Sequence, residues 1–213
     1  MTSNALQSSL PLRIVAVCGS LRDGGYTRLA LQIALRGAAQ VGAQTTLIDL
    51  REYDLSFCDG RRDTASYPPD VARLRQELQT AQGIILGTPV YHGGYSGVLK
   101  NMLDLTGFRE FEGKMIGLVG VSGGRTGAAH VLSTLRAIGR ALHAWVIPEE
   151  VSIAEAWKAF DSSRNLKDPD MEERLLEVGR RVARFAYLHT SEHAAEFVRL
   201  WEDAPANPGA SSP

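Results

Sequence analysis

The sequence predicts an α/β fold in which crossover helices cover a parallel sheet. Two observations support this fold class. Short β-branched segments alternate with longer segments of helical periodicity, and glycine-bearing loops follow three of the expected strands. A chain of 213 residues is long enough for one such domain with a closed hydrophobic core.

The expected strands are short and evenly distributed along the chain. In order they cover residues 13–18, 44–50, 83–88, 114–121 and 144–147. Pro89 is expected to end the third strand, because proline has no N–H to donate to a neighbouring strand. The polar segment 51–69, rich in Asp and Arg, has neither period and is long for a connection, which indicates a functional or interface element.

Apolar residues at helical spacing predict the helices. They cover residues 28–41, a short segment from Asp70, a segment capped by Ser96, and residues 127–142, 169–188 and 192–201. We expect a disordered N-terminal extension over residues 1–10 and one domain over 11–190. Residues 191–213 are expected to hold the last helix and a disordered tail rich in Pro, Ala and Ser.

The composition excludes several classes of function. The chain is 44% hydrophobic and 22% charged with a net charge of −1, and no basic tract predicts a nucleic-acid partner. No apolar run approaches the ~18 residues needed to span a membrane, and the N-terminus lacks the pattern of a signal peptide, so we expect a cytoplasmic protein. Cys18 and Cys58 cannot build a disulfide framework, and no Cys/His spacing predicts a metal site.

The first loop, residues 19–27, follows the first strand and leads into an apolar helix. It offers hydroxyls, a guanidinium and flexible glycines where free N–H groups and the helix dipole favour an anion. A P-loop is excluded, because Gly25 and Tyr26 stand where its Lys and magnesium-binding hydroxyl are needed. The loop also lacks the G-x-G-x-x-G spacing of a dinucleotide site.

A phosphatase loop is the third alternative for this segment. Cys18 precedes the loop, but Arg22 follows only four residues later, so the loop looks too tight to surround a transferring phosphoryl group. Cys18 is better interpreted as a buried strand residue. The first loop is therefore predicted to hold one phosphate monoester without a metal.

The second loop, residues 88–97, and the third, residues 122–126, also follow strands. A proline-fixed backbone, aromatic residues and glycines in the second loop suit a flat ring. The small residues of the third loop, with free N–H groups expected near a helix start, suit the polar edge of that ring. Each glycine alone is equally consistent with a tight turn. Loops at successive strand ends converge on one crevice, however, and a phosphate, a spacer and a flat heterocycle describe FMN.

With these motifs, the chain resembles the NAD(P)H-dependent FMN reductase family of flavodoxin-like proteins over about residues 13–188. The first loop is similar to the family's phosphate motif, with Gly25 in place of the usual Ser and Thr27 in place of the usual Asn. Residues 88–101 are similar to its isoalloxazine segment, with Val90, Tyr91 and His92 where many relatives have Glu-Tyr-Asn. These differences predict weaker FMN binding and leave the ring orientation open.

The resemblance implies a flavodoxin-like fold, with a doubly wound, five-stranded parallel sheet in three α/β/α layers and an FMN-binding domain over residues 11–190. It also implies that the three loops supply the residues that bind the cofactor. These are Ser20, Arg22, Gly25, Tyr26, Thr27, Pro89, Val90, Tyr91, His92, Gly93, Ser122, Gly123 and Gly124.

The resemblance further implies hydride transfer from NADPH or NADH through FMN to a small acceptor, which can be a free flavin, a quinone, an azo dye or a metal oxyanion. Because the cofactor carries the chemistry, we hypothesise positioning residues and no catalytic side chain. His92 is either a hydrogen-bond donor or a loop residue whose main chain binds, and we favour the second. Arg61 and Arg62 either meet the 2′-phosphate of NADPH or are solvated, and a homodimer or homotetramer is expected.

Two other functions stay open. A flavodoxin-type electron carrier would bind FMN without nicotinamide turnover, but such carriers are usually strongly acidic and this chain is nearly neutral. A non-enzymatic flavin-binding module is supported only by the altered residues Gly25 and Thr27. The colour of the purified protein and its NADPH consumption separate these alternatives.

Overall fold

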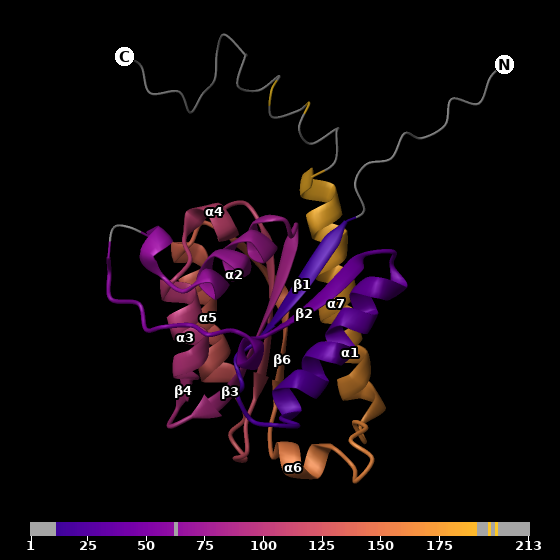
Figure 1. Ribbon diagram of the computed structural model, residues 1–213. Helices are drawn as coiled ribbons and strands as arrows, with labels where there is room; N and C mark the ends of the chain where they lie inside the picture. Colours follow the sequence, from indigo (N-terminus) through magenta and orange to yellow (C-terminus); the bar gives the residue numbers. More distant parts are fainter. Residues whose placement is uncertain (1–11, 62–63, 191–195, 197–198, 200–213) are drawn as a thin grey trace, which may run out of the picture.

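A computed structural model describes residues 12–61, 64–190, 196 and 199, and it places a central sheet between two layers of helices (Figure 1). Five parallel strands run in the order β2-β1-β3-β5-β6, so the strand order reverses between β1 and β3. This order is that of flavodoxin-like folds and confirms the predicted fold class. The strands are β1 (Arg13–Cys18), β2 (Gln44–Asp49), β3 (Gly83–Tyr91), β5 (Met115–Val121) and β6 (Trp145–Ile153).

The sequence predicted that the third strand ends at Pro89, and this is wrong. Strand β3 continues to Tyr91 and the chain then turns back into β4 (Gly94–Tyr95). Pairing with β1 stops at Gly87, so Pro89 lies where β3 has only β5 beside it in the parallel sheet, and proline is tolerated on such an edge. His92 and Gly93 both have positive φ, 49° and 76°, as the central residues of a tight hairpin require.

The last strand is longer than expected, because it extends through Pro148 to Ile153. The register with β5 shifts between Ile116 and Leu118, and the extra β6 residues at this bulge include Pro148. A proline and two glutamates conceal the strand pattern in the sequence. The bulge explains why they are nevertheless accommodated.

The helices confirm the three-layer arrangement. Side chains of α1 (Tyr26–Gln40) and α7 (Pro169–Thr190) share one buried cluster with the sheet, and those of α2 (Pro69–Gln79), α3 (Gly97–Asp104) and α5 (Ala129–Ala141) share another. Four shorter elements have too few residues to show a period in the sequence. They are α4 (Phe108–Phe111), α6 (Ala156–Ala159) and the 3₁₀ turns η1 (Leu50–Glu52) and η2 (Thr64–Ser66).

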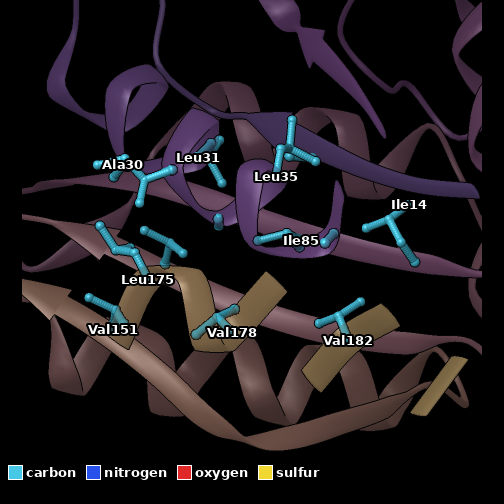
Figure 2. Close-up of a cluster of buried hydrophobic side chains, with 14 of the residues drawn as sticks. Ile14, Ala30, Leu31, Leu35, Ile85, Val151, Leu175, Val178 and Val182 are labelled. Atoms are coloured by element: carbon cyan, nitrogen blue, oxygen red, sulfur yellow. The ribbon is translucent and has the colours of Figure 1, made fainter. Parts of the chain in front are cut away.

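The first of these clusters supports the helix that opens the predicted phosphate site. Val178 and Val182 of α7 lie opposite Leu31 and Leu35 of α1, with the sheet beside them (Figure 2). The helices cross so closely that a Cβ on Gly179 would lie 1.8 Å from the carbonyl oxygen of Ala34. Burying each large aliphatic side chain contributes about 1.5–3 kcal/mol to the free energy of folding. These contacts therefore hold α1 firmly against α7 and the sheet.

Within the described residues, no helix is both long and apolar enough to cross a bilayer. The predicted terminal extensions, residues 1–10 and 191–213, lie outside the described part of the chain, apart from Glu196 and Arg199.

Candidate functional site

The three loops begin at the carboxyl ends of three neighbouring strands. Cys18 at the end of β1 pairs in register with Gly87 of β3, and Pro89 of β3 pairs with Val121 at the end of β5. The loops therefore emerge side by side from one edge of the sheet, at the point where the strand order reverses (Figure 1). In doubly wound sheets this is where ligands bind.

The first and second loops are joined by buried hydrogen bonds. The Gly19 N–H donates to the carbonyl of Gly87 at 2.8 Å, and the Ser96 hydroxyl donates to the carbonyl of Gly19 at 2.5 Å. Ser96 also accepts from the Leu99 N–H at 3.2 Å, which confirms it as the N-cap of α3. A Cβ on Gly19 would lie 2.8 Å from the Gly87 carbonyl oxygen, so the junction requires glycine.

Helix α1 begins beside the first loop without a side-chain cap. Gly25 stands at the N-cap position and makes no side-chain hydrogen bond. Ser20 and Thr27 are buried, with 3% and 2% exposure, and the Ser20 hydroxyl accepts a long hydrogen bond of 3.4 Å from the Arg22 N–H. Uncapped N–H groups and hydroxyl side chains are the donors that a phosphate monoester needs, so these residues fit the phosphate end of FMN.

Packing around position 25 also favours glycine. A Cβ at this position would lie 3.0 Å from Ser20 Oγ and 3.2 Å from the Arg22 carbonyl oxygen. The Gly25 N–H donates to that same carbonyl at 3.1 Å, which tightens the loop. A larger residue here would have to displace the Ser20 hydroxyl.

Charged residues at the end of β2 and directly after it contact the first loop. Buried Asp49 accepts hydrogen bonds from Arg51 and Arg28, and Arg51 also pairs with Asp23 of the loop at 2.9 Å. Burial raises the pKa of Asp49, but hydrogen bonds from Arg51 and the charges of Arg51 and Arg28 outweigh this and hold the pKa below its usual value. Our sequence reasoning missed this network, although Asp49 lies near the end of an expected strand and Arg51 follows that strand directly.

The second loop presents its tip to solvent. Pro89 is buried and Val90 half-buried, whereas Tyr91, His92 and Gly93 are exposed. The Arg22 guanidinium lies 5.8 Å from the centroid of the Tyr91 ring, so the first and second loops also meet through a cation–π contact.

The third loop is fastened to β6 and α6 by main-chain bonds. The Ser122 N–H donates to Ile153, and the carbonyls of Ser122 and Gly124 accept from Ala156 and Glu155, all at 2.8–3.0 Å. The Gly124 N–H donates to Ser122 Oγ at 3.1 Å. The expectation of free N–H groups is therefore wrong for Ser122 and Gly124, while Gly123 is exposed.

Two alternative interpretations can be checked against the geometry. Cys18 is buried, and burial raises the pKa of its thiol, which opposes a reactive thiolate and supports the interpretation as a strand residue. Arg61 hydrogen-bonds Asp59 and lies 4.5 Å from the centroid of the Tyr67 ring, so much of its guanidinium is already engaged. Arg62 lies outside the described residues.

A doubly wound sheet with three loops converging at its switch point is typical of a nucleotide-binding α/β protein. Comparisons with known proteins identify the family within this class. A family model described as NADPH-dependent FMN reductase matches residues 12–158. The chain belongs to the NADPH-dependent FMN reductase family and is accordingly an oxidoreductase with FMN as cofactor and NAD(P)H as hydride donor.

Individual relatives agree with this family. The NADPH-dependent FMN reductase ArsH of Shigella flexneri is 31% identical over 84% of this chain and 70% of its own length. An FMN-dependent NADPH-azoreductase of Staphylococcus aureus is 32% identical over 73% of this chain and 85% of its own. The solved structure of the NAD(P)H:acceptor oxidoreductase FerB from Paracoccus denitrificans shares the fold, with a TM-score of 0.65 at 21% identity, over 84% of this chain and 99% of that one.

Proposed function

We propose that this chain binds FMN across its three loops and uses it to pass hydride from NADPH or NADH to a small acceptor. The observation that carries the proposal is the uncapped start of α1, together with the buried residues Ser20 and Thr27 and with Arg22 in the same loop. FMN, when bound, supplies the hydride chemistry. The protein's own residues bind and orient it.

At the phosphate end, we propose that the side chains of Ser20 and Thr27 and the first N–H groups of α1, those of Tyr26 and Thr27, hold the anion. Arg22 adds a positive charge and, through its contact with Tyr91, couples the phosphate end to the ring end. Such an arrangement binds a phosphate monoester more strongly than a neutral hydroxyl, because charge-assisted hydrogen bonds are about twice as strong as neutral ones.

At the ring end, we propose that the main chain of residues 89–93 and of Ser122, Gly123 and Gly124 positions the flavin. Side chains here are exposed or small, which supports positioning without a catalytic side chain. The test is turnover by His92→Ala and Tyr91→Phe variants with FMN bound. Turnover within about tenfold of the wild-type rate supports the proposal. Loss of turnover with FMN still bound would contradict it.

For the acceptor, we propose a flat aromatic molecule, such as a flavin or an azo dye. The support is the names of two relatives, an FMN reductase and an azoreductase. Quinones and metal oxyanions are the remaining members of the test panel. The exposed Tyr91 ring offers a surface on which an aromatic acceptor can stack.

The experiment is steady-state oxidation of NADPH and NADH against this panel, after bound FMN has been measured. We expect turnover that requires FMN and an acceptor. FMN binding without nicotinamide oxidation would identify an electron carrier instead. A protein that binds no flavin would be the non-enzymatic alternative.

We also propose a cytoplasmic homodimer or homotetramer with the polar segment 51–69 at its interface. Phe57 in this segment is 84% exposed, more than any other large hydrophobic side chain of the described residues. Light scattering on the wild type and on Phe57→Ser tests the idea. A monomeric wild type would contradict it.

A further inference from the structure

The turn that follows α6 contacts the first loop and the start of α1. Phe160, the C-cap of α6, stacks on Tyr26 at the start of α1, with ring centroids 5.1 Å apart and planes inclined by 21°. Arg164 donates a hydrogen bond from Nη2 to the carbonyl of Gly24. Figure 1 shows α6 and the chain after it beneath the lower end of α1. The family match ends at residue 158, so both contacts come from a segment beyond it.

The turn is built to hold Arg164 in place. Phe160 and Leu166 form an antiparallel bridge, and Asp161 and Asn165 exchange backbone and side-chain hydrogen bonds of 2.8–2.9 Å. Arg164 itself has a left-handed φ of 69°, a conformation that glycine adopts more easily. A residue with a long side chain therefore occupies a position that local backbone preference would give to glycine.

The guanidinium packs directly against the peptide of Gly24. This glycine has a φ of 61°, and a Cβ built on it would lie 2.5 Å from Arg164 Nη1. Arg164 thus fills the space that a side chain at position 24 would need. Its hydrogen bond also offsets the partial negative charge of the Gly24 carbonyl, which would otherwise repel an anion in the same loop.

Four guanidinium groups and two carboxylates lie in the first loop or contact it directly or through one another, which leaves two net positive charges. Ion pairs join four members of this set, whereas Arg22 contacts Tyr91 and Arg164 contacts the Gly24 carbonyl. The members of the set are Arg22, Asp23, Arg28, Asp49, Arg51 and Arg164. A phosphate monoester carries about −1.5 to −2 at pH 7, so the set is nearly balanced when the anion binds.

We infer that the turn of residues 160–166 is an accessory part of the phosphate site, in which Arg164 holds the Gly24 peptide and supplies a positive charge. This inference rests on the proposed function, because it takes the anion to be the phosphate of FMN. Where the family motif has a serine hydroxyl at position 25, this chain uses a cation from a distant segment. Arg164 is a positioning residue for the cofactor.

The test compares the affinities of the full-length apoprotein for FMN and for riboflavin, which lacks the phosphate, by quenching of flavin fluorescence. Arg164→Met is expected to weaken FMN binding by about tenfold, while the riboflavin affinity stays within about twofold. Arg164→Lys is expected to recover part of the FMN affinity, because it keeps the charge and one donor. Arg174→Met, at an exposed arginine of α7, is the matched control and should bind both flavins as the wild type does.

The other outcomes overturn either the inference about Arg164 or the proposed function. If the wild type prefers FMN to riboflavin and Arg164→Met retains that preference, the inference is wrong and the proposed function stands. If Arg164→Met weakens both flavins equally, or only lowers the thermal midpoint, Arg164 is merely structural and the inference is wrong. If the wild type itself does not distinguish the two flavins, the phosphate site of the proposed function is wrong.

Discussion

The first and third loops of the site are held in different ways. Side chains from other parts of the chain hold the first loop: Arg51 pairs with Asp23, Arg164 binds the Gly24 carbonyl, and Ser96 binds the Gly19 carbonyl. The third loop is held mainly by its own backbone, through hydrogen bonds of Ser122 and Gly124 to β6 and α6. The loop proposed to carry the charged end of the cofactor is thus the one fixed by charge.

This difference predicts different sensitivities. A contact made by one side chain is lost when that side chain is replaced, and exposed ion pairs are screened by salt. Main-chain hydrogen bonds persist through most substitutions. The first loop should therefore respond to single substitutions, pH and salt, and the third should respond much less.

The largest expected difference is between Gly19→Ala and Gly123→Ala. The added Cβ at Gly19 would lie 2.8 Å from the Gly87 carbonyl oxygen and 2.9 Å from Leu99 Cβ, whereas the Cβ at Gly123 meets nothing within 4 Å. We expect Gly19→Ala to lower the free energy of unfolding by about 1–3 kcal/mol and Gly123→Ala to change it by less than about 0.5 kcal/mol. Urea unfolding measures both, and equal losses would remove the contrast.

Ser96→Ala and Ser122→Ala should show a smaller difference in the same direction. Ser96→Ala removes the N-cap of α3 and the bond to Gly19, for a cost of about 1–2 kcal/mol. Ser122→Ala removes only the bond from the Gly124 N–H, for about 0.5–1 kcal/mol. Ser133→Ala is the control, because the exposed Ser133 hydroxyl donates only to the Ala129 carbonyl within α5. A greater loss at Ser122 than at Ser96 would reverse the comparison.

The charged support of the first loop should weaken in acid. Because the pKa of Asp49 is lower in the folded state, its contribution to stability is complete above the ordinary pKa of 3.8 and is lost as the pH falls through the folded value. The stability difference between wild type and Asp49→Asn should therefore be constant from pH 7 to pH 5 and shrink below about pH 3.8. Urea unfolding across this range checks it, and a difference that grows in acid would oppose the account.

Salt should have the smallest effect. Raising NaCl from low to high concentration is expected to weaken FMN binding by a fewfold, because the Debye length falls from ~10 Å at 0.1 M to ~3 Å at 1 M. Riboflavin binding should change less, since riboflavin has no charged group at the first loop. Titrations of both flavins at the two salt concentrations measure the difference. An identical salt response of the two flavins would argue against an electrostatic phosphate site.

The sequence predicts the local parts of this molecule well. The first strand matches residue for residue, and the cap at Ser96 is confirmed, because both depend on neighbouring residues. The hairpin at His92 and Gly93 and the bulge around Pro148 were not predicted, since they depend on which strand lies alongside. The contact of Arg164 with Gly24 spans 140 residues, and no local pattern reports such a pairing.

The central claim is that the first loop holds the phosphate of FMN. The most direct measurement is the ratio of the dissociation constants of riboflavin and FMN for the wild-type apoprotein at low salt. The arrangement of Ser20, Thr27 and Arg22 predicts that FMN binds at least about tenfold more tightly, a preference of about 1.4 kcal/mol or more. Equal affinities for the two flavins would contradict it.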